Sequence, residues 1–446
     1  MALSTDDQRF LKGIYQELQD RPLQPGDPRY EPIYDHPGCE DPIDQLLKRI
    51  DFADTESLSL FSGFRGSGKT TELFRLQKNL EAIGYSVLYA DALDYINPAN
   101  PIEISDLLII LAGAFSDALK AQGLEISSDD YWTRFWNWLS KTDVSLKELG
   151  FKAEVGVDPV KAGADLKLEL RTAQTFRQRL AGVLSARIGE LHGEVTHFFE
   201  DGFKAIRKRR GDDTKVAFLF DSLEQIRGSV SNEQEVTRSI ERLFSNYLQL
   251  LQIPYMHLVY TVPPWLKFVL PGTDIMLLPC LRLWNNDGER SHCVPGNDAL
   301  CSLVTKRFSR EGLERFFGPD PLARAAKLMT LCGGHFRDLL LLLRETVLRA
   351  KSLPVTDEAI DGAILRVRSN FLPISLDDAQ WLAEIESERV ALLRTREPRE
   401  INRLTRFLDT HVVLYLKNGE EWYDVHPLVR DEVLAIARAA IPAESR

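Results

Sequence analysis

The sequence predicts an α/β protein with a parallel five-stranded core, a helical region after it and a C-terminal winged-helix domain. Three observations support this fold class. Short apolar runs alternate with helix-forming segments, the first run leads directly into a glycine-rich loop, and the C-terminal region ends in a hairpin pattern. Alternating strands and helices are typical of a parallel sheet, because each crossover between parallel strands needs a long connection.

The N-terminal half contains most of the predicted core. Apolar residues recur at helical spacing over residues 3–19, and three prolines between residues 22 and 28 end that helix. Apolar runs then predict five strands, at residues 58–61, 85–91, 216–221, 257–261 and 275–278. Helices are predicted between them over residues 72–81 and 104–120.

An insertion interrupts this alternation at about residues 122–171. It holds the aromatic run Tyr131–Trp138 and the stretch Phe151–Leu170, whose alternation at Leu166–Leu170 indicates a hairpin. The aromatic run fits a partner-binding surface or a helix that packs on the host domain, and burial of aromatics favours the packed helix. Residues 172–210 predict one long amphipathic helix. Its basic end, Arg207–Arg210, fits a nucleic-acid contact or, more simply, cations that complement the helix dipole.

The last third is predicted to be mainly helical. Residues 298–352 read as helices, short helices follow to residue 409, and alternating runs at 411–416 and 421–426 flank Asn418-Gly419, a strong hairpin signal. We therefore predict four regions. They are an N-terminal helix and proline-rich arm (1–34), the core with its insertion (35–285), a helical lid (286–356) and a winged-helix domain (357–446).

Composition excludes several protein classes. The 446 residues carry 55 Lys and Arg against 66 Asp and Glu, a formal net charge of −11, which disfavours a broad surface for nucleic-acid phosphates. No signal-peptide pattern and no long apolar span is present, so we expect a cytoplasmic protein without a membrane segment. The cysteines lack metal-ligand spacing and predict reduced, buried thiols; they are Cys39, Cys280, Cys293, Cys301 and Cys332.

The strongest functional motif is the loop Gly63-Phe-Arg-Gly-Ser-Gly-Lys69-Thr70, which lies between a predicted strand and a predicted helix. Glycines let successive backbone N–H groups converge on a phosphate without Cβ clashes. Lys69 would contact the β- and γ-phosphates of ATP, and Thr70 would bind Mg²⁺. The predicted nucleotide-binding residues are Gly63, Arg65, Gly66, Ser67, Gly68, Lys69, Thr70 and Thr71.

A second motif follows the strand at 216–221. Asp221 ends this buried run and would hold Mg²⁺ together with Thr70. Glu224 is the nearby carboxylate able to orient or activate the attacking water. The eight histidines, by contrast, show no paired-ligand spacing, which disfavours a zinc hydrolase.

With these motifs, the sequence resembles the AAA+ and STAND divisions of P-loop ATPases, most of all the origin-recognition and STAND-type group, over residues from about 35 to 440. The resemblance implies that Thr261 is a γ-phosphate sensor at the end of the next strand. Gly333-Gly-His-Phe-Arg337-Asp-Leu339 is similar to the lid motif of that group, which implies a second sensor role for Arg337.

The chain also departs from that pattern. Ser222 stands where many fast AAA+ motors have Glu, which indicates slow, switch-like turnover. An arginine finger from a neighbouring subunit has no clear source, and the candidates are Arg238, Arg242 and Arg282. The resemblance locates the adenine pocket only broadly, around residues 34–43.

Two functions are compatible with these residues. The first is a nucleotide-dependent switch, a prokaryotic signalling or defence ATPase that works with a separate protein partner and could form a nucleotide-dependent homo-oligomer. The second is a DNA-binding initiator or target-selection ATPase whose winged helix binds duplex DNA. Acids on the predicted wing, Glu420, Glu421 and Asp424, disfavour phosphate contact and so favour the protein-partnered switch.

Overall fold

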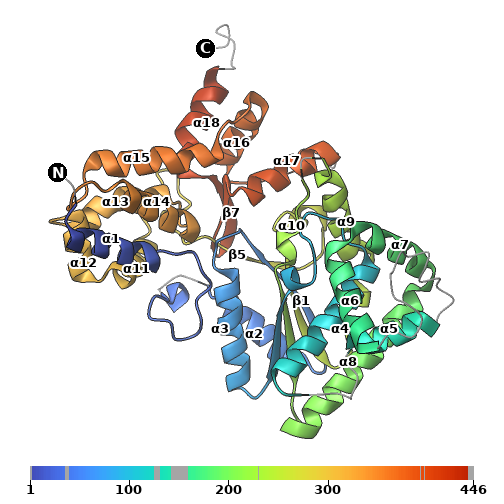
Figure 1. Cartoon of the computed structure of the whole chain (residues 1–446). Helices are drawn as coiled ribbons and strands as arrows, with labels where there is room; N and C mark the ends of the chain where they lie inside the picture. The colour runs from blue at the N-terminus through green and yellow to red at the C-terminus, as the bar shows by residue number, and fades with distance from the viewer. Residues whose placement is uncertain are drawn as a thin grey trace. The chain divides into compact units, whose positions relative to one another are not determined.

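The computed structural model describes residues 3–35, 40–124, 131–141, 159–229, 231–391, 393–395 and 397–439 (Figure 1). The chain divides into two compact units. The loop unit comprises Met1–Pro42, Gly63–Arg75 and Leu277–Arg446, and the sheet unit comprises Ile43–Ser62 and Leu76–Met276. Each unit thus combines segments that are far apart in the sequence.

The predicted parallel sheet is present, with strand order β2-β3-β4-β1-β5. Its strands are β1 (Ser57–Gly63), β2 (Ser86–Asp91), β3 (Val216–Asp221), β4 (Met256–Val262) and β5 (Ile275–Leu278). The pairs β2–β3, β3–β4 and β4–β1 are parallel, with Asp91 opposite Asp221 and Phe61 opposite Thr261. The carboxyl ends of these strands therefore lie on one edge of the sheet. The sheet is therefore of the predicted α/β class.

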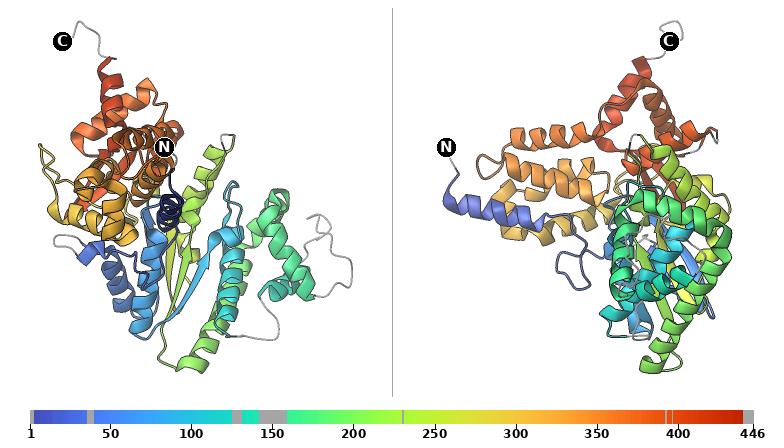
Figure 2. Two further views of the ribbon diagram at one scale, coloured as in Figure 1. Left: turned by 60° about the vertical axis from the view of Figure 1, so that its left-hand side comes forward. Right: turned by 45° about the vertical axis from the view of Figure 1, so that its right-hand side comes forward.

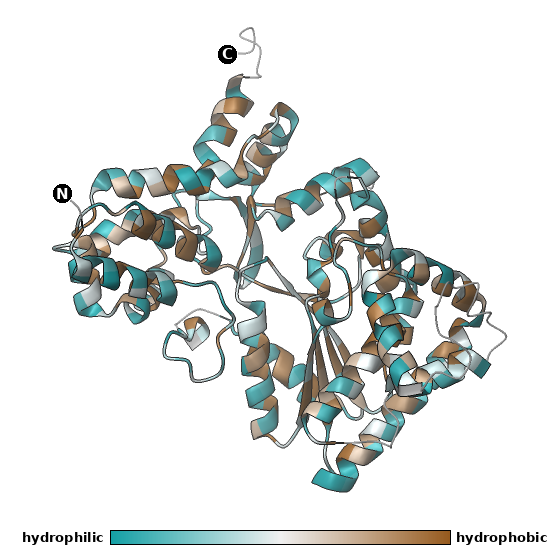
Figure 3. Cartoon of the chain, in the orientation of Figure 1, coloured by the Kyte–Doolittle hydropathy of each residue, from teal (hydrophilic) through white to brown (hydrophobic). Residues whose placement is uncertain are grey.

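Helices cover the sheet and bury its apolar strands, which are brown in Figure 3. The sheet unit contains the helices α2 (Pro42–Phe52), α4 (Ile104–Ala121), α5 (Tyr131–Lys141), α6 (Pro159–Thr172), α7 (Gln174–Leu184), α8 (Ile188–Arg210), α9 (Glu233–Asn246) and α10 (Leu266–Val269). Of these, α5 and α7 pack on α4, and α6 packs on α5 and α7. Helix α4 is buried on most of its surface because β2 and helices α5, α7 and α8 contact it (Figure 2). At its centre Phe115 stacks on Phe199, with ring centroids 4.3 Å apart.

The insertion is helical where the structure describes it, so a strand at Leu166–Leu170 is wrong. The first part of the stretch predicted to form a hairpin, residues 151–158, lies outside the described residues. Leu166 and Leu170 are buried and Leu168 is 59% exposed, as expected for a helix face repeating every four residues rather than a strand face repeating every two. The aromatic run forms α5, and its Trp132 packs so closely on Gly113 of α4 that a Cβ there would lie 2.0 Å from the indole ring. This contact confirms the packed-helix interpretation.

The long helix predicted over residues 172–210 is broken into two. Helix α7 ends at Leu184, a short 3₁₀ turn covers Ser185–Arg187, and α8 then continues to Arg210. The four basic residues form the last turn of α8, where Arg209 donates to the backbone oxygen of Gly123 at 2.6 Å. This placement agrees with cations at a helix C-terminus.

The loop unit is mainly helical. Its elements are α1 (Thr5–Glu17), the start of α3 (Lys69–Ala82), α11 (Val294–Phe308), α12 (Arg310–Phe317), α13 (Pro321–Leu331), α14 (Phe336–Arg349), α15 (Asp357–Arg368), α16 (Leu376–Glu388), α17 (Pro398–Asp409), α18 (Pro427–Ala439) and the hairpin β6 (Val413–Asn418) and β7 (Glu420–Val425). Strands β6 and β7 pair antiparallel, and Gly419 turns the chain between them at φ +89°. The hairpin predicted around Asn418-Gly419 is therefore confirmed.

Asp424 of β7 does not contribute to an acidic wing surface, because it is fully buried. Its carboxylate accepts hydrogen bonds from Arg290, Arg389 and Arg430 at 2.8–2.9 Å, and from the Trp284 indole at 2.9 Å. The expectation that Asp424 repels phosphate from the hairpin is thus wrong. Glu420 and Glu421 are exposed as expected.

The thiols in the described chain are free: Cys280, Cys293 and Cys332 are buried and Cys301 is partly exposed. Cys39 lies outside the described residues. Within that same part of the chain, every helix is too short or too polar to cross a membrane.

Candidate functional site

The loop from Gly63 to Thr70 connects β1 to α3, as its sequence predicts. Gly66 and Gly68 adopt φ of +90° and +97°, a conformation that favours glycine. Lys69 is buried, and its ammonium donates to the backbone oxygens of Gly63 and Phe64 at 2.9 and 3.0 Å. The lysine therefore folds back over its own loop, with its charge held beside the backbone that would surround a phosphate.

The polar side chains of the loop have different surroundings. The Ser67 hydroxyl is buried and has no hydrogen-bond partner within the described residues. The Arg65 side chain is exposed, and Thr70 occupies the first turn of α3. The Thr71 hydroxyl accepts a hydrogen bond of 3.0 Å from the Leu23 backbone N–H, so the N-terminal arm lies against the start of this helix.

In the sheet unit, Asp221 ends β3 with no exposed surface. Its two carboxylate oxygens accept hydrogen bonds from the Tyr89 hydroxyl at 3.0 Å and the Ser222 backbone N–H at 2.7 Å. Both contacts fix the orientation of the carboxylate at the strand end. Burial, followed by the nearby Asp221 charge, raises the pKa of Tyr89 well above its ordinary value, so the tyrosine remains a donor.

Two further carboxylates are near Asp221. Ser222 adopts φ +71° and leads into a 3₁₀ turn that contains Glu224, which is 7% exposed. Asp91 is the register partner of Asp221 on the neighbouring strand. Burial is the largest cause of its raised pKa, to which the charges of Asp94 and Glu224 also contribute. The strand ends thus concentrate negative charge, an arrangement suited to a divalent cation.

Thr261 lies near the end of β4, opposite Phe61 of β1. It is fully buried, and its hydroxyl has no hydrogen-bond partner among the residues that the structure describes. Because buried hydroxyls are usually paired, this group is suited to contact a ligand.

Arg337 is the second residue of α14, and its side chain lies directly against the loop from Gly63 to Thr70, the phosphate-type loop. A Cβ built on Gly66 would lie 2.5 Å from the Arg337 Cβ and 2.8 Å from its Nε. Only glycine leaves room for this approach. The guanidinium also forms an ion pair with Asp20, from the segment after α1. The sequence did not predict this partner.

Comparisons with known proteins give two archaeal structures of similar length. The ORC2 protein of Aeropyrum pernix, solved as ADPNP–ADP complexes, has 10% identity and a TM-score of 0.35 over 90% of this chain and 93% of its own. Cdc6p of Pyrobaculum aerophilum has 11% identity and a TM-score of 0.32 over 89% and 94%. No family model and no curated protein matches the sequence. Both TM-scores lie below 0.5.

The structure also places the arginine-finger candidates. Arg242 forms an ion pair of 2.9 Å with Glu103, and the Nε of Arg282 lies 3.2 Å from the Cys293 sulfur. Arg238 is exposed on α9. In the segment predicted to form an adenine pocket, the Arg75 guanidinium lies 5.5 Å from the centre of the Tyr34 ring, and residues 36–39 lie outside the described chain.

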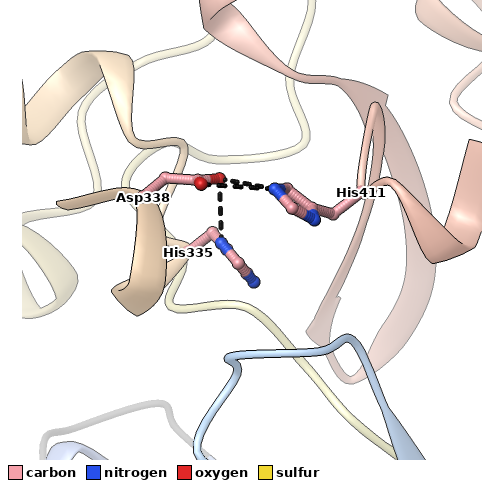
Figure 4. Close-up of side chains that lie close together, drawn as sticks. All are labelled: His335, Asp338 and His411. Carbon is pink, nitrogen blue, oxygen red and sulfur yellow. Dashed lines mark hydrogen bonds and ion pairs between the residues drawn. The ribbon is translucent and has the colours of Figure 1, made fainter. Parts of the chain in front are cut away.

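Sequence reasoning missed a buried cluster beside Arg337. His335 and Asp338 flank it in the chain, and His411, which precedes β6, lies beside them (Figure 4). His426, which follows β7, contacts the same Asp338. Donor atoms of His335, Asp338 and His411 all lie within 4.8 Å of one another, and these residue types can bind metal. The His335 and His411 rings are stacked at 4.2 Å, however, so one ion cannot lie in both ring planes. The sequence carries no spacing signal for this cluster, because its members come from separate segments.

Proposed function

We propose that this chain is a Mg²⁺-dependent ATPase in which nucleotide state controls contact with a protein partner. The observation that carries the proposal is the loop itself. Two left-handed glycines, an inward-folded Lys69 and the close approach of Arg337 over Gly66 form a surface built from backbone N–H groups and cations. Such a surface is complementary to a polyphosphate.

The residues present fit ATP and Mg²⁺. The buried hydroxyls of Ser67 and Thr261 are without hydrogen-bond partners in the described chain, and a phosphate would supply acceptors. The sequence combines the loop motif with an acid at the end of a buried strand, so we infer that the loop and Asp221 act on one nucleotide. When bound, Mg²⁺ would neutralise phosphate charge, held by Thr70 and Asp221.

The other side chains have distinct roles in this proposal. The Lys69 ammonium would move from the loop carbonyls to the β- and γ-phosphates, with loop backbone from Gly63 to Thr71 around them. Glu224 would orient the attacking water, which fits its burial beside the end of β3. Thr261 would contact the γ-phosphate, and Arg337 would exchange Asp20 for a phosphate oxygen.

Mutation of Lys69 tests the nucleotide assignment. We expect Lys69→Ala to weaken Mg-ATP binding at least tenfold, because it removes a charge-assisted phosphate contact, a change of about 1.4 kcal/mol or more. Lys78→Ala, an exposed lysine on the same helix, is the matched control. Titration with a fluorescent ATP analogue measures both. Unchanged affinity in Lys69→Ala would exclude this loop as the nucleotide site.

We further propose that the partner is a protein, as for a prokaryotic signalling or defence switch that acts in the cytoplasm. The arginines of the C-terminal region are compensated by acids: Arg394 pairs with Glu384, Arg403 and Arg406 with Asp378, and Arg389 with Asp424. Paired arginines offer little net charge to phosphates.

DNA binding is the second candidate function. The buried position of Asp424 favours it, since one acid fewer faces the solvent than the sequence indicated. In that alternative the C-terminal helices and hairpin form a winged helix that contacts duplex DNA, and ATP drives assembly on it.

A further inference from the structure

The buried cluster of His335, Asp338, His411 and His426 joins the phosphate-type loop to the C-terminal hairpin within the loop unit. His335 caps the start of α14, and its Nε2 lies 3.0 Å from the backbone oxygen of Arg65 in the loop. Its Nδ1 lies 2.8 Å from Oδ2 of Asp338. One fully buried imidazole therefore contacts both the loop backbone and a buried carboxylate.

The same carboxylate contacts both ends of the hairpin. His411 precedes β6, and its Nε2 lies 3.0 Å from Oδ2 of Asp338. His426 follows β7, and its Nε2 lies 3.1 Å from the same oxygen. Phe371 packs over both rings, at 5.4 and 4.7 Å between centroids. Both ends of the hairpin thus contact the Asp338 carboxylate, which also contacts His335.

Counting hydrogen bonds fixes the protonation of the cluster. Nδ1 of His426 accepts from the Leu428 backbone N–H, so its Nε2 must carry the proton and donate to Asp338. His335 faces an acceptor at each nitrogen, the Arg65 carbonyl and the Asp338 carboxylate. It can satisfy both only as the doubly protonated imidazolium. The cluster then pairs one cation with one carboxylate.

The directions of the pKa shifts in the cluster agree with a charged Asp338 and with neutral His411 and His426. Although burial alone would raise it, the charge of His335 and the hydrogen bonds from His335 and His411 hold the pKa of Asp338 well below its ordinary value. Burial lowers the pKa of His411 and of His426, so both remain neutral donors. The other ionisable groups that act on the cluster are Arg337, Arg430, Cys280 and Cys332.

Glycines make this junction tight. A Cβ on Gly333 would lie 2.5 Å from the Leu414 side chain of β6, and one on Gly334 would lie 1.8 Å from the Leu281 backbone oxygen. Both residues adopt positive φ, +61° and +80°. The backbone before His335 therefore has little room to move by itself. We expect a displacement of the phosphate-type loop to displace the hairpin as well.

We propose that His335 is a positioning residue that couples the conformation of the phosphate-type loop to the C-terminal hairpin through Asp338. The inference rests on the proposed function, since nucleotide must occupy the loop. A change in the direction of the Arg65 carbonyl alters the His335 hydrogen bond, and the altered pairing with Asp338 reaches His411 and His426. Coupling of this kind is reciprocal, so the hairpin also affects nucleotide affinity by the same factor.

Hydrogen exchange of the full chain tests this coupling. In the wild type, a slowly hydrolysed ATP analogue with Mg²⁺ should change the exchange rates of amides 413–425 at least threefold. In Asp338→Asn, which keeps the shape but removes the charge, the analogue should still bind while this hairpin response disappears. Asp361→Asn, an exposed carboxylate paired with Lys327 on the surface, is the matched control and should respond as the wild type does.

Two further measurements separate the alternatives. If Asp338→Asn does not fold, judged by circular dichroism, His411→Gln removes only the hairpin side and should give the same uncoupling. Stoichiometric bound zinc, measured by mass spectrometry of the metals, would overturn the imidazolium assignment.

The outcomes distinguish this inference from the proposed function. Failure of the wild type to bind the analogue would contradict the nucleotide assignment itself. Binding by the wild type with an unchanged hairpin, or a hairpin response that survives in both Asp338→Asn and His411→Gln, would overturn the coupling through His335 and leave the nucleotide assignment standing.

Discussion

At the scale of single residues, the buried position of Glu224 beside the end of β3 indicates its role in the proposed reaction. A left-handed Ser222 directs the chain into the 3₁₀ turn that keeps this carboxylate 7% exposed beside the end of β3. A non-glycine residue in this conformation is uncommon, and such strain often accompanies a functional position. Glu224 is accordingly our candidate for orienting the attacking water.

We expect Glu224→Gln to lower the rate of ATP hydrolysis at least a hundredfold, because the amide cannot accept a proton from water. Mg-ATP affinity should change less than threefold, since Lys69 and the loop remain intact. Phosphate release under single-turnover conditions gives the rate, and Glu235→Gln on exposed helix α9 serves as the control. Full hydrolysis by Glu224→Gln would remove this residue from the mechanism and leave binding unaffected.

At the scale of elements, the sequence identifies segments whose signals are local. The five strands are apolar runs that end at a loop or an acid, and the glycine loop lies between one strand and one helix. The prediction of a strand at Leu166–Leu170 was wrong because these residues fit both the two-residue repeat of a strand and the i, i+4 repeat of a helix. The histidine cluster could not be predicted, because its members come from three distant segments and carry no spacing signal.

Helix α4 contains a buried carboxyl group, Asp106, whose charged form is disfavoured by burial. Burial raises the pKa of Asp106 from 3.8 to about 6, although Arg177 lies 3.9 Å away and acts in the opposite direction. The folded state therefore holds this proton more tightly than the unfolded state. The protonated Asp106 therefore makes its full contribution to the free energy of unfolding below pH 3.8. This contribution is lost as the pH rises through about 6.

We therefore expect Asp106→Asn to stabilise the protein at pH 8, by at most about 3 kcal/mol from this pKa difference, and to have little effect at pH 4. Urea unfolding at both pH values measures the free energies. Asp165→Asn, an exposed carboxylate on α6, should leave both unchanged. Equal effects of Asp106→Asn at the two pH values would contradict the assigned titration.

At the scale of the whole molecule, charge separates the two candidate functions. The net charge is −11, and the C-terminal arginines Arg394, Arg403 and Arg406 are each paired with an acid. A DNA-binding surface needs uncompensated cations, because release of counterions from the duplex supplies most of the nonspecific affinity. The protein-partnered switch is therefore the function that the charge distribution favours.

We expect duplex DNA to change neither the solution mass nor the rate of phosphate release of the full chain, even at low salt where such binding is strongest. Sedimentation with ADP, with a slowly hydrolysed ATP analogue, and with the analogue plus DNA measures the mass. Assembly or turnover that requires DNA would favour the initiator-like alternative. A mass that rises with the analogue alone would instead indicate a nucleotide-dependent homo-oligomer.

The contact between His335 and the Arg65 carbonyl can form only after both residues have been translated. The two residues are 270 positions apart, and ribosomes add roughly 5–20 residues per second, so the loop emerges roughly 15–50 s before its histidine. During that interval the nascent chain has the phosphate-type loop but neither Arg337 nor the hairpin. A nascent chain that binds nucleotide during this interval has no hairpin, so the proposed coupling can act only after the hairpin has been translated.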